Sequence, residues 1–124
     1  MRAYWRSCAW LLWGLCCVPA GVQAHAHLLA SEPPAQAVID QTPQLLRLKF
    51  SEPVEKKWTR IDVKAGTETL TLSSADFQWD AAGKAVQVTL PKHVPSLTYQ
   101  VEWSVLAKDG HPSKGRLNFK VKPQ

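Results

Sequence analysis

Sulfur is absent from most of this sequence. The chain has 124 residues, but its three cysteines (Cys8, Cys16 and Cys17) and its only methionine all fall within residues 1–24. Residues 25–124 therefore cannot form a disulfide scaffold or a cysteine zinc ribbon, and they offer no thiol nucleophile. This sulfur-free part has the length of one domain, enough to bury roughly 60–70% of its unfolded surface.

An excess of charge of one sign is also missing. The chain holds 15 Lys and Arg against 10 Asp and Glu. Arg2 and Arg6 lie in residues 1–24, which contain no acidic residue, so residues 25–124 carry 13 basic against 10 acidic side chains, a net charge of +3. The two signs are interspersed, whereas nucleic-acid-binding proteins usually gather basic residues on one face. We expect no nucleic-acid partner.

Residues 1–24 have the pattern of a secretory signal peptide. A basic start precedes an apolar run, residues 8–18, and small residues stand at the positions read by a signal peptidase, ending with Ala24. The run is too short to span a membrane as a helix. We therefore expect export and cleavage after Ala24, which makes His25 the first residue of the mature protein.

Residues 1–24 also fit two alternatives to a cleaved signal. The segment could remain as an uncleaved membrane anchor, although its apolar run is short for that purpose. It could also be a lipoprotein signal, but Cys16 follows Leu15 and Cys17 follows Cys16. A lipid-modified cysteine usually follows a small residue, so this alternative is the weaker one.

The pattern of residues 25–124 is typical of an all-β domain. Five segments alternate apolar and polar residues: 46–50, 60–64, 86–90, 99–105 and 117–122. Each predicts a strand with one buried and one solvated face. Turn residues separate the segments, prolines fall between strands or at their ends, and no long stretch shows a helical apolar stripe. We expect a small Greek-key β-barrel or sandwich of about seven strands.

The aromatic residues of the strands are candidates for the core. Four of them occupy apolar positions of the alternating segments: Phe50, Tyr99, Trp103 and Phe119. Trp58 and Trp79 fall near predicted strand ends, so we expect them to be partly exposed.

The histidines are the strongest indication of function, and two of them lie at the expected new N-terminus. His25 and His27 are separated by Ala26. A free α-amine has a pKa of roughly 7.7–8, so a metal ion can displace its proton near neutral pH. The amine and the imidazole of His25 can then chelate one ion. Alternatively, the amine, two deprotonated backbone amides and His27 can bind Cu(II) or Ni(II) in a square plane, and both modes favour Cu(II) over zinc or calcium.

A second group of ligand-type residues lies far along the chain. Asp109 and His111 flank Gly110 directly after a predicted strand. In an extended stretch, residues two apart point the same way, so the carboxylate and imidazole can converge on one ion. Gly110 permits a tight turn and Pro112 stiffens the exit. The alternative is a plain Asp-Gly turn with an incidental histidine.

The donor set favours one oxidation state of copper. Cu(I) prefers thiolate and thioether sulfur, and blue-copper centres require a cysteine; residues 25–124 have neither Cys nor Met. An amine, imidazoles and a carboxylate suit Cu(II). His93, in a proline-rich turn, is interpreted as a surface histidine without a ligand role.

Three segments resemble the CopC family of periplasmic copper-binding proteins. They are HAHLLASEPPAQA at 25–37, LRLKFSEPV at 46–54 and LTYQVEWSVLAKDGHPSKGRLNF at 97–119. The resemblance implies a cupredoxin-like or immunoglobulin-like β-barrel in the periplasm that binds one Cu(II). It implies His25, Asp109 and His111 as ligands, with His27 as a direct, axial or more distant participant. It also implies an inner-membrane CopD-like partner.

These features are compatible with three functions. The leading hypothesis is a non-enzymatic, monomeric periplasmic Cu(II)-binding protein that buffers, carries or delivers copper. A copper-dependent oxidative enzyme with an N-terminal histidine is the second. Asp109 would fill a position that oxygen chemistry needs open, and such enzymes are generally larger. The third is a metal-free structural sandwich domain.

Overall fold

A computed structural model describes residues 25–124. This part of the chain forms nine strands and two single-turn 3₁₀ helices, η1 (Lys56–Trp58) and η2 (Ser74–Asp76). Within it, no helix is long and apolar enough to cross a membrane. The expected signal peptide, its cleavage after Ala24 and the anchor alternative concern residues outside the described part.

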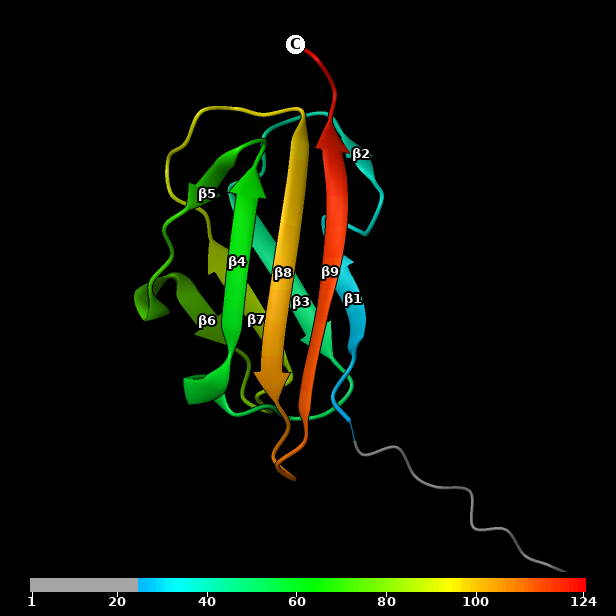
Figure 1. Cartoon of the computed structure of the whole chain (residues 1–124), viewed down its shortest axis with the longest axis vertical. Helices are drawn as coiled ribbons and strands as arrows, with labels where there is room; N and C mark the ends of the chain where they lie inside the picture. Colours follow the sequence, from blue (N-terminus) through cyan, green and yellow to red (C-terminus); the bar gives the residue numbers. More distant parts are fainter. Residues whose placement is uncertain (1–24) are drawn as a thin grey trace, which may run out of the picture.

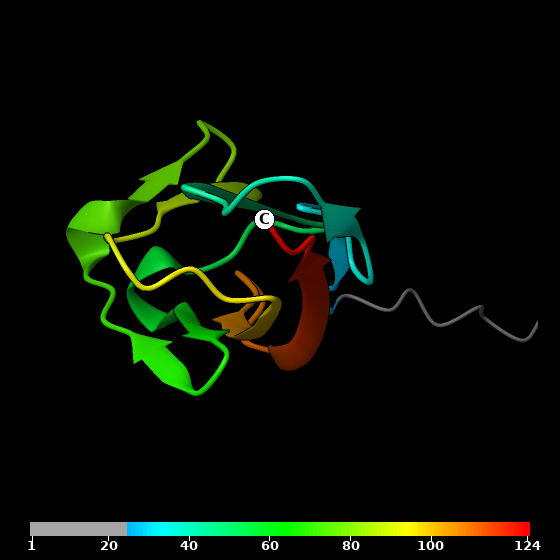
Figure 2. The same cartoon turned by 90° about the horizontal axis from the view of Figure 1, so that it is seen from above.

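The strands form two sheets that pack face to face (Figures 1 and 2). In order across the first sheet, the strands are β1 (Leu28–Glu32), β3 (Leu45–Phe50), β7 (Ala85–Thr89) and β6 (Phe77–Trp79). In order across the second, they are β2 (Val38–Ile39), β9 (Pro112–Val121), β8 (Thr98–Leu106), β4 (Arg60–Ala65) and β5 (Glu68–Leu70). The chain passes between the sheets after β1, β2, β3, β5 and β7. Among the described strands, only β2 pairs in parallel, with β9. The prediction of an all-β Greek-key sandwich is confirmed.

The core lies between the two sheets and follows the predicted alternation. Every second residue of β3, β4, β7 and β8 is buried, and so is every second residue in the second half of β9. The four predicted core aromatics are all buried. Tyr99 stacks on Phe119 with ring centroids 5.0 Å apart, and Phe50 meets Trp103 edge-on at 5.3 Å. Trp79 is half-buried, and Trp58 is 68% exposed.

The structure has more strands than the seven expected, for two physical reasons. β2, β5 and β6 contain only two or three residues, which is too few to show an alternating pattern. β1 is an edge strand whose register against β3 shifts between Leu28 and Ala30, so its burial does not alternate. β9 also begins earlier than predicted, at Pro112.

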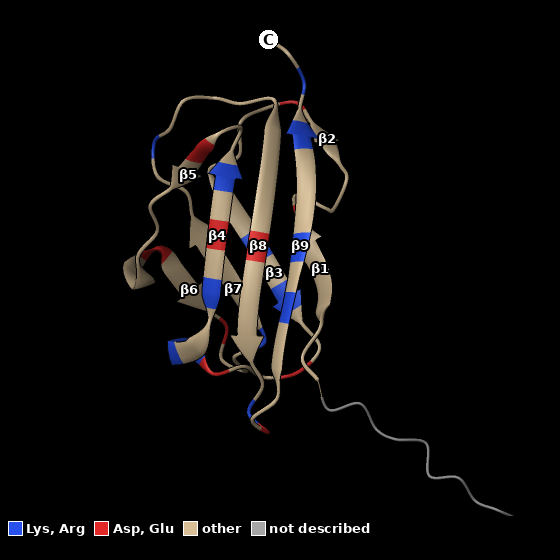
Figure 3. Cartoon of the chain, in the orientation of Figure 1, with Lys and Arg blue, Asp and Glu red and all other residues tan. Residues whose placement is uncertain are grey.

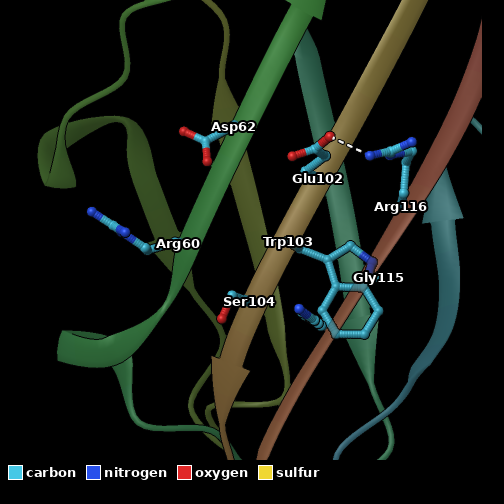
Figure 4. Close-up of a pocket in the computed structure, with 8 residues that line it drawn as sticks. Arg60, Asp62, Glu102, Trp103, Ser104, Gly115 and Arg116 are labelled. Atoms are coloured by element: carbon cyan, nitrogen blue, oxygen red, sulfur yellow. Dashed lines mark ion pairs between the residues drawn. The ribbon is translucent and has the colours of Figure 1, made fainter.

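The outer face of the second sheet carries charges of both signs (Figure 3). Glu102 accepts hydrogen bonds from Arg116 Nη2 and from Gln100 Nε2, each at 2.8 Å. A shallow hollow of about 580 Å³ lies over these strands, where the indole of Trp103 reaches Gly115 of β9 (Figure 4). Interspersed charge is typical of the solvated face of an antiparallel sheet.

Candidate metal centre

The two predicted ligand groups meet at one end of the sandwich. Residues 25–27 lead into β1, and Asp109 and His111 lie in the connection between β8 and β9, at the same end of the molecule (Figure 1). The imidazole rings of His25 and His111 have centroids 4.8 Å apart and cross at 85°. The fold therefore places side by side two histidines from opposite ends of the domain.

The turn between β8 and β9 positions Asp109 and His111. The amide of Ala107 donates to the carbonyl of His111, and the amide of Gly110 donates to the carbonyl of Ala107, both at 2.9 Å. Gly110 has φ +91°, a conformation that favours glycine and is common in three-residue hairpin connections. The expected extended geometry is therefore wrong: a tight turn brings the carboxylate and the imidazole together, as the glycine permits.

Both carboxylate oxygens of Asp109 contact His111. Oδ1 accepts the backbone N–H of His111 at 3.1 Å, and Oδ2 lies 3.0 Å from His111 Nδ1. The backbone hydrogen bond, followed by the side-chain hydrogen bond, holds the pKa of Asp109 below its usual value. A neutral His111 donates from Nδ1 to this carboxylate, so its Nε2 lone pair is free to bind an ion. Both side chains are accessible from solvent.

His27 is held by a residue that was not predicted from the sequence. Ser51, directly after β3, donates its amide to the carbonyl of His27 at 2.8 Å and accepts the His27 amide on Oγ at 3.0 Å. The same oxygen lies 3.1 Å from His27 Nδ1 and 3.4 Å from the carbonyl oxygen of His25. The only sequence signal for Ser51 was its place in the FSEPV segment.

His93 lies at the opposite end of the sandwich. Its Nε2 is 2.8 Å from the hydroxyl of Tyr99, and its Nδ1 is 2.8 Å from the carbonyl oxygen of Pro91. Both ring nitrogens are thus used in structural hydrogen bonds. The geometry agrees with the interpretation of His93 as a histidine outside the candidate site.

A complete ligand cluster is not preassembled in residues 25–124. No three side chains of the types His, Cys, Asp and Glu converge there on a common point that could hold an ion. His25, Asp109 and His111 come close as two contacting pairs, with His111 in both. In the full chain the nitrogen of His25 is bonded to Ala24, so an amine donor at His25 would require cleavage after Ala24.

Comparison with known proteins identifies the family. A model of the CopC domain matches residues 28–122. The chain belongs to the CopC domain family. Asp109 and His111 lie inside the matched range, whereas the two N-terminal histidines precede it.

Two CopC relatives match this chain along most of their length, and a third matches over a small part of its own. Protein YobA of Escherichia coli K12 is 36% identical over 107 residues, covering 85% of each chain. Copper resistance protein C of Xanthomonas campestris is 30% identical, covering 83% of this chain and 84% of its own. Copper transport protein CutJ of Bacillus subtilis is 28% identical over 112 residues, only 20% of its length.

Solved CopC structures share the fold. CopC from Methylosinus trichosporium OB3b, 24% identical, has a TM-score of 0.70 over 81% of this chain and 96% of its own. PcoC from E. coli, a methionine-rich copper resistance protein, is 25% identical with a TM-score of 0.66. The match covers 79% of this chain and 99% of PcoC. The resemblance seen in the sequence is confirmed. CopC proteins bind copper and are not enzymes, which also confirms the non-enzymatic prediction.

Proposed function

We propose that the mature protein is a periplasmic Cu(II)-binding protein that begins at His25 and takes one copper ion as cargo. The observation that carries the proposal is the contact between the rings of His25 and His111, 4.8 Å apart. The names of the relatives, copper resistance protein C and copper transport protein CutJ, support copper as the ion.

The donors at this end of the sandwich match the preferences of Cu(II). Cleavage after Ala24 gives an amine beside the imidazole of His25, and the two can chelate one ion. His111 offers Nε2, and Asp109 supplies a negative charge that either binds the ion or orients the imidazole. PcoC is described as methionine-rich, whereas residues 25–124 of this chain have no methionine. The proposal is therefore limited to a Cu(II) site.

Titration of the mature protein with Cu(II) tests this site. We expect one Cu(II) per chain, and an affinity that falls by more than about tenfold when a glycine precedes His25 or when His111→Ala is introduced. The extension separates the amine from the imidazole, and the substitution removes a ligand. His93→Ala, at the far end, is the control and should keep the affinity of the wild type.

Two results would reject the proposed site. Equal affinity in the wild type, the extended protein and His111→Ala would place copper elsewhere. Absence of stoichiometric binding would favour the metal-free sandwich domain. The oxidative-enzyme alternative is disfavoured because the family consists of copper-binding proteins that are not enzymes.

The partner and the oligomeric state are also part of the proposal. This chain matches a stretch amounting to 20% of the copper transport protein CutJ, so a similar domain occurs within a much longer protein. We infer that the present chain acts as a monomer and exchanges copper with a separate, CopD-like protein of the inner membrane. Co-purification of the two proteins from membranes, with and without copper, would test this exchange partner.

A further inference from the structure

Two copper-binding modes are open to a chain that begins His-Ala-His. One uses the amine and imidazole of His25 together with Asp109 and His111. The other uses the amine, the backbone amide nitrogens of Ala26 and His27, and the imidazole of His27, in a square plane. We propose that Ser51 decides between them, by withholding His27 from the backbone mode. This inference rests on the proposed Cu(II) binding and names the residue that sets its coordination.

The backbone mode makes strict demands on His27. Its amide nitrogen must exchange a proton for the metal, and its Nδ1 must reach the same ion. Nδ1 is the ring nitrogen nearer to the backbone, so it closes a small chelate ring with the amide, whereas Nε2 faces away. In a free peptide nothing competes for these two atoms except water.

In the folded protein, the hydroxyl oxygen of Ser51 is within hydrogen-bond distance of both the amide nitrogen and Nδ1 of His27. Ser51 Oγ lies 3.0 Å from the amide nitrogen of His27 and 3.1 Å from its Nδ1. The Ser51 amide also donates to the carbonyl of His27 at 2.8 Å, so the residue is tied to the end of β3 by its backbone and its side chain. Any metal that takes the amide and Nδ1 must first break these hydrogen bonds.

Ala26 gives a second obstacle to the backbone mode. Its side chain is fully buried in the core, with 0% exposure. Wrapping residues 25–27 around an ion requires both peptide units to turn their nitrogens toward it, which would pull Ala26 out of the core. Burial and the Ser51 hydrogen bonds therefore oppose the same movement.

The same serine favours the other mode. Its Oγ lies 3.4 Å from the carbonyl oxygen of His25, which helps to fix the backbone beside the β8–β9 turn. The imidazole of His25 stays exposed and in contact with that of His111. Ser51 is thus a positioning residue: it keeps His27 engaged and leaves His25 facing the second ligand group.

The test compares coordination in the protein with that in a reference peptide. The peptide His-Ala-His-Leu, residues 25–28, supplies the electron paramagnetic resonance and visible spectra of the backbone mode with Cu(II). The mature wild type and Ser51→Thr, which keeps a hydroxyl, should give a different spectrum from the peptide. In Ser51→Ala, part of the signal should convert to the peptide form, and adding His111→Ala should convert more. Ser104→Ala, on the outer face of β8, is the matched control without conversion.

Ni(II) provides a measurement that needs no substitution. Square-planar nitrogen sites accept Ni(II), so the peptide should form the backbone complex with Ni(II) alone. The wild type, shown to be folded by circular dichroism, should lack the absorption of that complex. The appearance of the peptide spectrum in the wild type, with either metal, would overturn the role of Ser51.

An unchanged Cu(II) spectrum in folded Ser51→Ala would overturn it as well. Either result would leave the proposed function standing, because copper would still be bound by the mature N-terminus. Failure of the wild type to bind Cu(II) at all is a different outcome and rejects the proposed function itself.

Discussion

At position 115 the second sheet has room only for a hydrogen atom. A Cβ built on Gly115 would lie 2.5 Å from Cζ2 and 2.8 Å from Cε2 of Trp103, on the paired residue of β8. The indole cannot withdraw freely, because it also packs against Phe50 in the core. The lack of a side chain at Gly115 thus lets a large aromatic cover the start of β9.

We predict that Gly115→Ala lowers the free energy of unfolding by about 1–3 kcal/mol, because the added methyl overpacks a filled site. Urea unfolding followed by tryptophan fluorescence measures this loss. Lys114→Ala, the neighbouring residue on the outer face, should change the free energy by less than about 0.5 kcal/mol. A loss no larger in Gly115→Ala than in Lys114→Ala would show that Trp103 adjusts at little cost.

The site residues differ in how far the sequence could reveal them. The sequence suggests Asp109 and His111 as candidate ligands because their chemistry and the intervening Gly110 are adjacent in the chain. It suggests His25 because the pattern of a cleavage site precedes it. It does not suggest Ser51, because the hydrogen bonds of Ser51 to His27 join residues that are 24 positions apart. Serine side chains have many roles in proteins. Ser51 reaches His27 because β1 pairs with β3.

At the scale of elements, Asp80 organises the turn between β6 and β7. Its Oδ1 accepts the amides of Lys84 at 2.9 Å and Ala85 at 3.1 Å. These hydrogen bonds, that of Ala85 most of all, favour the charged carboxylate and lower its pKa from the ordinary value of 3.8. The ionised form of Asp80 therefore supports the hairpin more strongly than the protonated form.

The lowered pKa of Asp80 determines the direction in which stability changes with pH. Folding lowers the pKa of Asp80, so its stabilising effect is complete above pH 3.8 and is lost as the pH falls through the lowered value. We predict that Asp80→Asn lowers the melting temperature of the metal-free protein at neutral pH, and that the difference from wild type shrinks below pH 3.8. Thermal melts from pH 7 to pH 3 measure it, with Asp62→Asn on the open face of β4 as control. A difference that stays constant to pH 3 would contradict the ionic role.

The elements that the sequence predicted are those with a repeating pattern of burial. β3, β4, β7 and β8 place apolar residues at every second position, so period-two alternation located them. The start of β9 escaped because its inward positions hold Ser113 and Gly115 in place of large apolar residues. There the buried surface comes from Trp103 across the sheet, and no local pattern within β9 records it.

At the scale of the whole molecule, the candidate site joins opposite ends of the chain. His25 belongs to the segment entering β1, an edge strand of the first sheet, while His111 precedes β9 in the second sheet. The described strands β1 and β9 share no sheet, so an ion held by both histidines would add a link between the two layers. Such a link would exist only in the folded state, because unfolding separates the two histidines.

A ligand that binds the native state more tightly than the unfolded chain raises stability by mass action; with no binding to the unfolded chain, the gain is about 2.7 kcal/mol at a free concentration 100 times the dissociation constant. The gain is smaller here, because the unfolded N-terminus can still hold Cu(II) in the backbone mode. We therefore predict that Cu(II) raises the melting temperature of the mature wild-type protein, as measured by circular dichroism. The rise should be smaller in His111→Ala, which cuts the link on the β9 side. It should also be smaller in protein with one glycine before His25, because the extension separates the amine from the imidazole of His25. Equal rises in all three would mean that copper stabilises the fold from another site. No rise in the wild type under stoichiometric binding would mean that the ion rests on the N-terminal segment alone and does not join the two sheets.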